Sequence, residues 1–290
     1  MPWRDWTARY NGLLLGEGTP YDLIEIAGLL DAPEVRTADK ARLQRPGMIL
    51  GRDVVGGRTV TLTVEVWGRD VGEFESALTA FVAAFTPARP LSSFRFLFPG
   101  VAGGALSEVD AVVRRRSVPM RVPDYLYQRA ECVVELWCPE PRIFSPPQTA
   151  VAGPPEPAPG VRFPLRFPVR FPTGRSASGA ATVLNTGNAP TDVQVRLVGP
   201  VPSPRIINYT TGQVLALDLN LGENDFLDVD FGTRTVLLNG TASRYASLLS
   251  RPAWWELEPG QPTRLGYRAA VGYQPGRSSH MQITWRSATL

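Results

Sequence analysis

Hydrophobic and polar side chains alternate along much of the first half of this chain, as they do in strands that bury one face. The clearest run is 59–67, in which valines and a leucine at the even positions alternate with threonines and a glutamate at the odd positions. The pair Gly56-Gly57 just before this run predicts a hairpin turn. Apolar or alternating runs predict further strands at 21–30, 93–98, 109–116 and 130–137.

One segment of the chain instead carries the spacing of a convincing helix. Over 72–86, apolar side chains recur three and four positions apart, which places them on one helical face. Glu73 and Glu75 stand in the first turn, where the helix dipole favours acidic groups, and Pro87 ends the pattern. The apolar face, which we interpret as core packing, consists of Phe74, Ala77, Leu78, Phe81, Val82 and Phe85.

Short alternating runs dominate the second half of the chain as well. Over 213–221 four leucines occupy alternate positions, and over 226–231 two aspartates alternate with apolar side chains. The dipeptide Asn239-Gly240 predicts a tight turn. Further strands are expected at 193–198, 263–271 and 280–287. Short strands with a turn roughly every 8–12 residues are typical of a β-sandwich.

A proline-rich segment, 144–175, separates the two halves. Its second part repeats Arg-Phe-Pro three times, at every fourth position, over 162–172. Proline at this spacing excludes a helix and a central strand, so we interpret the repeat as an extended arm or an edge strand. We therefore predict an N-terminal domain over 1–145, a proline-rich linker or arm over 146–175 and a C-terminal domain over 176–290.

The composition supports two folded domains rather than disorder or a nucleic-acid binder. Of the 290 residues, 43% are hydrophobic and 20% are charged, so each half can bury a core. The 27 glycines and 28 prolines exceed ordinary usage and agree with many turns. The formal net charge is only +3, and every basic residue except Lys40 is an arginine.

Neither the cysteines nor the apolar runs point to secretion or to a membrane. Cys132 and Cys138 are separated along one predicted strand by about 20 Å, whereas a disulfide needs Cα atoms within about 7 Å. We therefore expect free thiols and folding in a reducing compartment. The N-terminal segment lacks the apolar region of a signal peptide, and no run of about 18 apolar residues is present to span a membrane.

The residue types that most enzymes and metal sites require are scarce. His280 is the only histidine, so we expect neither a histidine-based metal cluster nor a Ser-His-Asp triad. No phosphate-binding glycine-rich loop occurs, and the acidic segment 218–225 lacks the spacing of a calcium loop. The sequence therefore predicts no catalytic residue, no metal ligand and no cofactor site.

Two groups of residues leave a sugar-related function open. Asp228 and Asp230 lie on one strand face, about 6–7 Å apart, which permits the paired carboxylates of a glycosidase. Trp254 and Trp255 are candidates for stacking on a sugar, although adjacent strand residues point to opposite faces. A carbohydrate-binding adhesin and, more remotely, a sandwich-fold hydrolase are therefore the alternatives to a structural role.

Two groups of arginines are candidates for contacts with acidic partners or nucleic acid, and solvated surface groups are the plainer interpretation of both. The first is a triplet on the predicted strand 109–116, and the second lies in the proline-rich segment, where no acid occurs between Glu156 and Asp192. The arginines are Arg114, Arg115 and Arg116 in the triplet, and Arg162, Arg166, Arg170 and Arg175 in the segment.

The order of several motifs resembles siphophage distal tail proteins. In the first half, GMILGRDVVGGRTVTLTVEVWGRD (47–70) precedes a helix with the pattern EF-x-x-A-L, and a later strand ends in CPEPRIFS (138–145). In the second half, the family's order is a strand, a glycine, I-x-N-x-x-T-G, a D-x-D strand, an N-G turn and W-x-x-L-x-P-G. The matching segments here are 187–221, 225–240 and 254–260.

This resemblance implies a mainly β fold: an N-terminal β-sandwich or split-barrel domain with one helix, then a galectin-like C-terminal β-sandwich. It also implies a structural, non-enzymatic virion protein, made in the bacterial host cytoplasm, that forms a hexameric ring at the tail tip. The expected partners are further copies of the chain, the tail tube protein, the tape measure protein and the tail-tip hub or fibre proteins. DNA would pass through the ring without specific recognition, and no membrane is involved.

Overall fold

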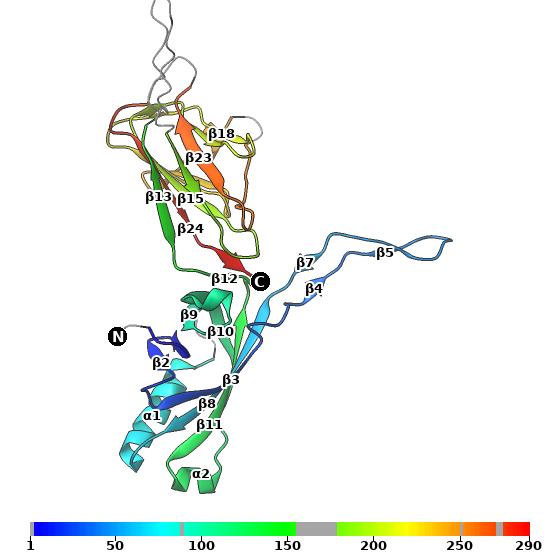
Figure 1. The fold of residues 1–290 in the computed structure, drawn as a ribbon, viewed down its shortest axis with the longest axis vertical. Coiled ribbons are helices and arrows are strands. Elements are labelled where there is room, and N and C mark those ends of the chain that lie inside the picture. The colour runs from blue at the N-terminus through cyan, green and yellow to red at the C-terminus, as the bar shows by residue number, and fades with distance from the viewer. Residues whose placement is uncertain (1–2, 88–89, 155–178, 250–251, 271–274) are drawn as a thin grey trace, which may run out of the picture. The chain divides into compact units, whose positions relative to one another are not determined.

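The structure is a computed structural model that describes residues 3–87, 90–154, 179–249, 252–270 and 275–290. It divides into two compact units, which Figure 1 shows coloured along the chain. Unit 1 comprises residues 1–146 with 289–290, and unit 2 comprises residues 147–288. No helix in the described ranges is long and apolar enough to cross a membrane.

Unit 1 is built on one antiparallel sheet whose strand path does not close into a barrel. The longest pairing in the sheet joins β8 (Arg58–Trp67) to β11 (Arg129–Cys138), and both strands bury their even-numbered residues. This alternation is the one that the sequence predicts. The path runs β2 (Leu13–Leu15), β1 (Thr7–Tyr10), β9 (Ser92–Leu97), β10 (Ser107–Ser117), β11, β8 and β3 (Tyr21–Ala27), and β12 (Ile143–Phe144) also pairs with β10.

The predicted helix is confirmed as α1 (Val71–Ala84), which packs against β8. Asp70 caps its first turn, because its carboxylate accepts a hydrogen bond of 2.8 Å from the backbone N–H of Glu73. The Glu73 carboxylate in turn accepts from the backbone N–H of Arg69, the residue before the cap, at 3.0 Å, which ties the preceding chain to the first turn. The buried face joins the strands in one core, and its residues are Phe74, Ala77, Phe81 and Ala84.

The hairpin turn predicted at Gly56-Gly57 is wrong. Strand β7 (Val54–Val55) pairs with β4 (Val35–Arg36), whereas β8 pairs with β3 and β11. Gly57 serves close packing instead, since a Cβ added there would lie 2.4 Å from the Trp137 ring. Two further elements were not predicted: the short helix α2 (Val122–Leu126) and the 3-10 turn at Ala102–Gly104.

Unit 2 is a sandwich of two antiparallel sheets whose inward side chains form one hydrophobic cluster. The six-stranded sheet has the order β13 (Gln148–Ala152), β24 (His280–Trp285), β15 (Val193–Val198), β20 (Phe226–Asp230), β21 (Thr235–Leu238) and β22 (Ala242–Ser243). The four-stranded sheet has the order β14 (Ala180–Val183), β23 (Thr263–Arg268), β17 (Arg205–Asn208) and β18 (Val214–Ala216). Outside these sheets lie β16 (Val201–Pro202), β19 (Asn220–Leu221) and the 3-10 turn Tyr245–Ser247. The last strand, β25 (Ala288–Thr289), pairs with β12.

Most predicted elements of this half are present, including the Asn239-Gly240 turn, in which both residues have positive φ. The single strand expected over 213–221 is wrong, because the run divides into β18, which pairs with β17, and β19, which pairs with β16. The break follows Leu217, whose backbone bridges to Leu248 instead. Alternation alone could not show this, since Leu215, Leu217 and Leu221 are all buried.

The proline-rich linker predicted over 146–175 is wrong in its first part. Residues 148–152 form β13, which pairs with β24 along its whole length at the edge of the six-stranded sheet. These residues contain no proline, so every backbone N–H remains available for pairing. The Arg-Phe-Pro repeat over 162–172 lies outside the described residues, as do Arg162, Arg166, Arg170 and Arg175.

Candidate functional site

The most unusual surface in unit 1 is a two-stranded hairpin, residues 34–55, between β3 and β8 (Figure 1). Strand β4 pairs with β7 near its base, and β5 (Lys40–Ala41) pairs with β6 (Met48–Ile49) near its end. The backbone N–H of Gly56 closes the base by donating to the carbonyl of Glu34 at 2.7 Å. Every residue from 34 to 55 is exposed except Asp39 and Gly51, which are half-buried.

Large apolar side chains lie on this hairpin without covering a core. Leu43 is 92% exposed and Leu50 is 85% exposed. A two-stranded hairpin alone is marginally stable in water, and contiguous exposed apolar surface marks a site of interaction. The other exposed apolar residues of the hairpin are Val35, Met48, Ile49, Val54 and Val55.

The end of the hairpin, residues 40–52, is also basic, and we call this segment the hairpin tip. It lies between Asp39 and Asp53 and contains no acidic residue. Its four cations make no ion pair with any residue that the structure describes. They are Lys40, Arg42, Arg45 and Arg52.

The base of the hairpin, by contrast, is anchored in the sheet by Arg58. This side chain is 2% exposed, and its Nη1 donates to the carbonyl of Gly28 at 3.2 Å and to that of Leu29. Burial lowers the pKa of Arg58, while Cys138 and Asp31 act in the opposite direction. The chain is therefore fixed where the hairpin begins and exposed along the hairpin itself.

The arginine triplet predicted as a charged contact has divided roles. A β-bulge in β10 after Val113 places Arg115 opposite Glu135 and Arg116 opposite Val134. Arg115 forms an exposed ion pair with Glu135 at 3.3 Å, and Arg114 is exposed at the bulge. Arg116 instead donates to the carbonyls of Val82 (2.6 Å) and Phe85 (3.2 Å) at the C-terminal end of α1.

We expect Arg116→Ala to lower the free energy of unfolding of unit 1 by about 2 kcal/mol. The substitution removes hydrogen bonds from a charged donor and a cation at the negative end of the helix dipole. The matched control is Arg114→Ala, two positions earlier on the same strand, for which we expect a change within about 0.5 kcal/mol. Urea unfolding of the intact protein and of the two variants measures these changes in the free energy of unfolding. Equal losses in both variants would show that Arg116 does not cap α1.

The sugar-site candidates do not come together on one face. Asp228 is held by Arg196 through two contacts of 2.6 and 2.9 Å, which also raise the pKa of Arg196. Asp230 accepts from Gln194 and from two backbone N–H groups of the turn after β20. These carboxylates line an open groove of about 420 Å³ on the outward face of the six-stranded sheet.

The two tryptophans lie on the other side of β20. Trp255 is 6% exposed, and its ring centroid is 4.3 Å from that of Phe231, which is a core residue. Trp254 meets the same Phe231 ring edge-on at 5.5 Å and stacks on Tyr245. The tryptophans therefore serve packing, and the outward groove contains no aromatic platform among its lining residues.

The remaining candidates have structural roles. Cys132 and Cys138 are buried free thiols, and burial raises the pKa of each to about 11, so little thiolate forms at neutral pH. In the acidic segment 218–225, Asp225 accepts from Gly222 and Asn239 and so closes a turn. His280 is half-buried on β24, with Nδ1 3.3 Å from the carbonyl of Ser278.

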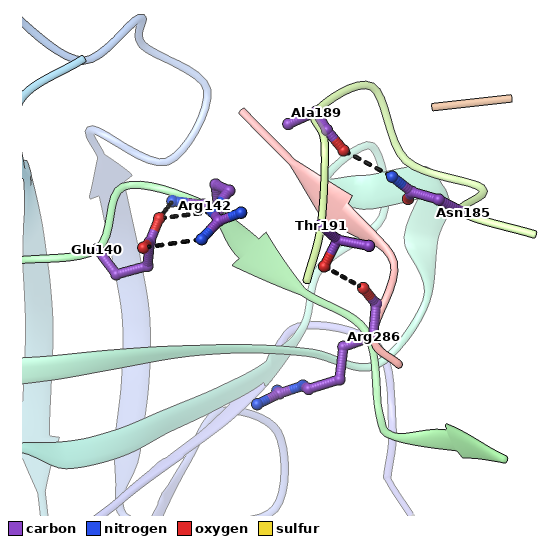
Figure 2. A network of polar contacts seen from close by, with 6 residues as sticks. All are labelled: Glu140, Arg142, Asn185, Ala189, Thr191 and Arg286. Atoms are coloured by element: carbon purple, nitrogen blue, oxygen red, sulfur yellow. Dashed lines mark hydrogen bonds and ion pairs between the residues drawn. The ribbon is translucent and has the colours of Figure 1, made fainter. Parts of the chain in front are cut away.

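Figure 2 shows polar contacts that stabilise each unit separately. In unit 1, Glu140 and Arg142 form an ion pair with a shortest distance of 2.8 Å. In unit 2, the side-chain amide of Asn185 donates to the backbone carbonyl of Ala189 at 2.7 Å. The Thr191 hydroxyl donates to the backbone carbonyl of Arg286 at 2.8 Å. None of these contacts needs a ligand.

The sequence pattern did not predict the hairpin as a separate surface. Its segment contains short apolar runs such as Met48-Ile49-Leu50, and such runs are ordinarily assigned to a core. The sequence did contain one sign that this segment covers no core. Its apolar positions between 34 and 55 follow neither the period of a helix nor that of a strand that buries one face. Exposure of the whole segment only became visible in three dimensions.

Comparisons with known proteins define the class first. Residues 186–287 match the family described as siphovirus-type tail component, C-terminal domain. This part of unit 2 is therefore similar to the C-terminal domain of siphovirus-type tail components. No curated protein sequence matches the chain.

The whole chain then matches a particular kind of tail protein in fold. The crystal structure of the Dit protein of phage SPP1 superposes with a TM-score of 0.68 at 13% identity, covering 98% of this chain and 99% of that one. Two chains from structures of the phage p2 baseplate in its activated conformation are also similar. The chain from the calcium structure has a TM-score of 0.47 at 6% identity, covering 92% of this chain and 91% of that one. The chain from the strontium structure has a TM-score of 0.48 at 7% identity, covering 96% of each chain. The resemblance to siphophage distal tail proteins is confirmed, and the mainly β fold with one long helix is that of SPP1 Dit.

Proposed function

We propose that this chain forms a hexameric ring at the distal tip of a long phage tail. Unit 1 makes the ring, which joins the tail tube to the baseplate hub and lets DNA pass through. The tail component domain in unit 2 supports this assignment, as does the fold shared with SPP1 Dit, which is described as a paradigm of the hub adsorption apparatus. The galectin-like character of unit 2 stays a prediction.

The observation that carries the proposal is the exposed hairpin over 34–55. Its side chains cover no core in this chain, so an isolated copy leaves the apolar surface of Leu43 and Leu50 in water. Contact with another subunit would remove that surface from water and order the hairpin. A contact between two different patches on identical subunits repeats around an axis and closes into a ring when the rotation from one subunit to the next divides a full turn.

The proposal gives unit 2 the task of attaching other tip proteins, and it assigns no catalysis to either unit. The candidate carboxylates already bind Arg196, Gln194 and backbone groups. The partners would be the tail tube protein, the tape measure protein and the tail-tip hub or fibre proteins. The free, buried thiols are consistent with synthesis in the host cytoplasm before incorporation into the virion.

Removing the hairpin tests the ring directly. Residues 35–55 are replaced by Asn-Gly, so that Glu34 and Gly56, which already share a hydrogen bond, close a short turn. We expect the intact chain to show a mass near six copies, or twice that for back-to-back rings, by light scattering, with annular negative-stain images. The shortened chain should be a monomer with an unchanged melting temperature, because the hairpin buries little of its own surface.

Two outcomes would contradict the proposal. Rings formed by the shortened chain would show that the hairpin does not carry assembly. An intact chain that stays monomeric at high concentration, even with tail tube and hub proteins present, would exclude the ring and shift the assignment toward a carbohydrate-binding adhesin.

A further inference from the structure

An acidic groove runs along the outer edge of the unit 1 sheet. It has a volume of about 450 Å³ and lies along β3, the strand at the end of the sheet path. An edge strand leaves backbone hydrogen-bonding groups unpaired on its outer side. We call this feature the β3 groove, and its lining residues are Trp6, Gly16, Glu17 and residues 22–26.

The β3 groove combines negative charge with exposed apolar side chains. Glu17, Asp22 and Glu25 line it, no lysine or arginine does, and none of the three acids forms an ion pair with a described residue. Arg4 and Arg9 lie in a neighbouring hollow that shares only Glu17 with this groove.

A β-bulge creates the apolar part of the groove. The pairing of β3 with β8 shifts between Leu23 and Glu25, so Ile24 has no partner in the register. Ile24 is 61% exposed, and Trp6 across the groove is 54% exposed. The edge of the sheet thus presents two large apolar side chains between carboxylates.

The hairpin tip has the complementary chemistry. It carries four cations and no acid over 40–52, together with Leu43, Met48, Ile49 and Leu50, all of which are exposed. The groove carries three acids and no cation, together with Trp6 and Ile24. Charge of opposite sign around apolar centres is the arrangement that selects one partner surface over others.

We propose that the hairpin tip of one copy binds the β3 groove of the next copy. This inference rests on the proposed self-assembly and names the two surfaces that make it. Residues 36–45 cover about 30 Å when extended, and only residues 28–33 separate the hairpin from β3. The tip would therefore have to fold back on itself to reach the groove of its own chain. Two different patches meet, which makes the contact heterologous and able to close a ring.

The sole lysine of the chain allows a specific crosslinking test. A carbodiimide joins the Lys40 amine to a neighbouring carboxylate, and mixing isotope-labelled with unlabelled protein distinguishes links between copies from links within one. We expect mixed-isotope peptides that join Lys40 to Glu17, Asp22 or Glu25. The matched control is Lys40→Arg, which keeps the charge and the assembly but removes the amine and therefore these products.

Charge reversal tests the pairing without crosslinks. Asp22→Arg with Glu25→Arg, or Arg42→Glu with Arg45→Glu, should each weaken assembly about a hundredfold or more, because like charges then face each other. A chain that carries all four substitutions should assemble again, since the complementarity is restored with its sign exchanged. Glu75→Arg, on the exposed face of α1, is the control and should assemble as the intact chain does.

The outcomes separate this inference from the ring itself. If the intact chain forms rings but Lys40 links elsewhere, or if both reversed pairs still assemble, the pairing is overturned and the ring stands. Links found only within one chain would likewise overturn it, because the groove would then bind its own hairpin. If the intact chain never assembles, even with its tail partners, the ring and the pairing fail together.

Discussion

Asn185→Asp is expected to lower the free energy of unfolding of unit 2 by about 3 kcal/mol or more at neutral pH, although the side chain keeps its size. The Asn185 amide is buried and donates to the carbonyls of Ala189 at 2.7 Å and Leu257 at 3.0 Å. Its oxygen accepts from the backbone N–H groups of Gly187 and Ala288. Aspartate keeps the acceptor but places a second carboxylate oxygen against two carbonyl oxygens.

The pH dependence separates this cause from a general loss of packing. Burial and the two carbonyls raise the pKa of the new carboxyl above its unfolded value. The loss of stability is therefore small at a pH below about 4, and it grows as the pH rises through the folded-state pKa. Amide hydrogen exchange in β15 and β24, measured at several pH values, gives this loss of stability for unit 2 alone.

Asn220→Asp is the matched control for this prediction. Asn220 is exposed and uses only its oxygen, as acceptor from the N–H of Ser203 at 3.2 Å. A carboxylate can still accept that bond, so we expect a change within about 0.5 kcal/mol. Equal effects at Asn185 and Asn220, or a loss at Asn185 that does not vary with pH, would contradict the assigned role of the buried amide.

Phe81→Ala is expected to lower the free energy of unfolding of unit 1 by about 3–5 kcal/mol, because it opens a cavity in the middle of the core. Phe81 is completely buried, and its ring lies 6.2 Å from that of Tyr21 on β3 and 4.8 Å from that of Phe85. The side chain therefore joins the helix to the edge of the sheet. Hydrogen exchange in β8 and β11 measures the loss in this unit separately.

Val71→Ala is the control within the same helix, since Val71 is 57% exposed at the first position of α1. We expect a change within about 0.5 kcal/mol, because alanine has the better helix propensity and little apolar surface is lost. If Phe81→Ala cost no more than Val71→Ala, α1 would not be part of the core of unit 1.

Local patterns predicted the elements well where one face of an element is buried. The alternation over 59–67 became β8, and the apolar spacing over 72–86 became α1 with Phe74 and Phe81 inward. The pattern failed at Gly56-Gly57, because a turn dipeptide does not say whether its flanking strands pair with each other. It failed again at residues 148–152, where neighbouring prolines concealed a strand whose partner lies far along the chain.

The candidate contacts were harder to foresee because they depend on which faces meet. Arg114, Arg115 and Arg116 look alike in sequence, yet a bulge turns only Arg116 toward the end of α1. Trp254 and Asp228 are both plausible sugar ligands, yet the strand β20 separates their faces. A one-residue shift of register changes the face of every side chain that follows it.

The sequence by itself determined that this chain is mainly β with one amphipathic helix, and its motif order indicated the distal tail family. These properties depend on periodicity and on short motifs, which are local along the chain. Only the tertiary structure decided that residues 34–55 cover no core and that β3 lies at an edge with acids around Ile24. Exposure and edge position are properties of the whole fold, because they depend on which segments remain unpaired after all others have packed.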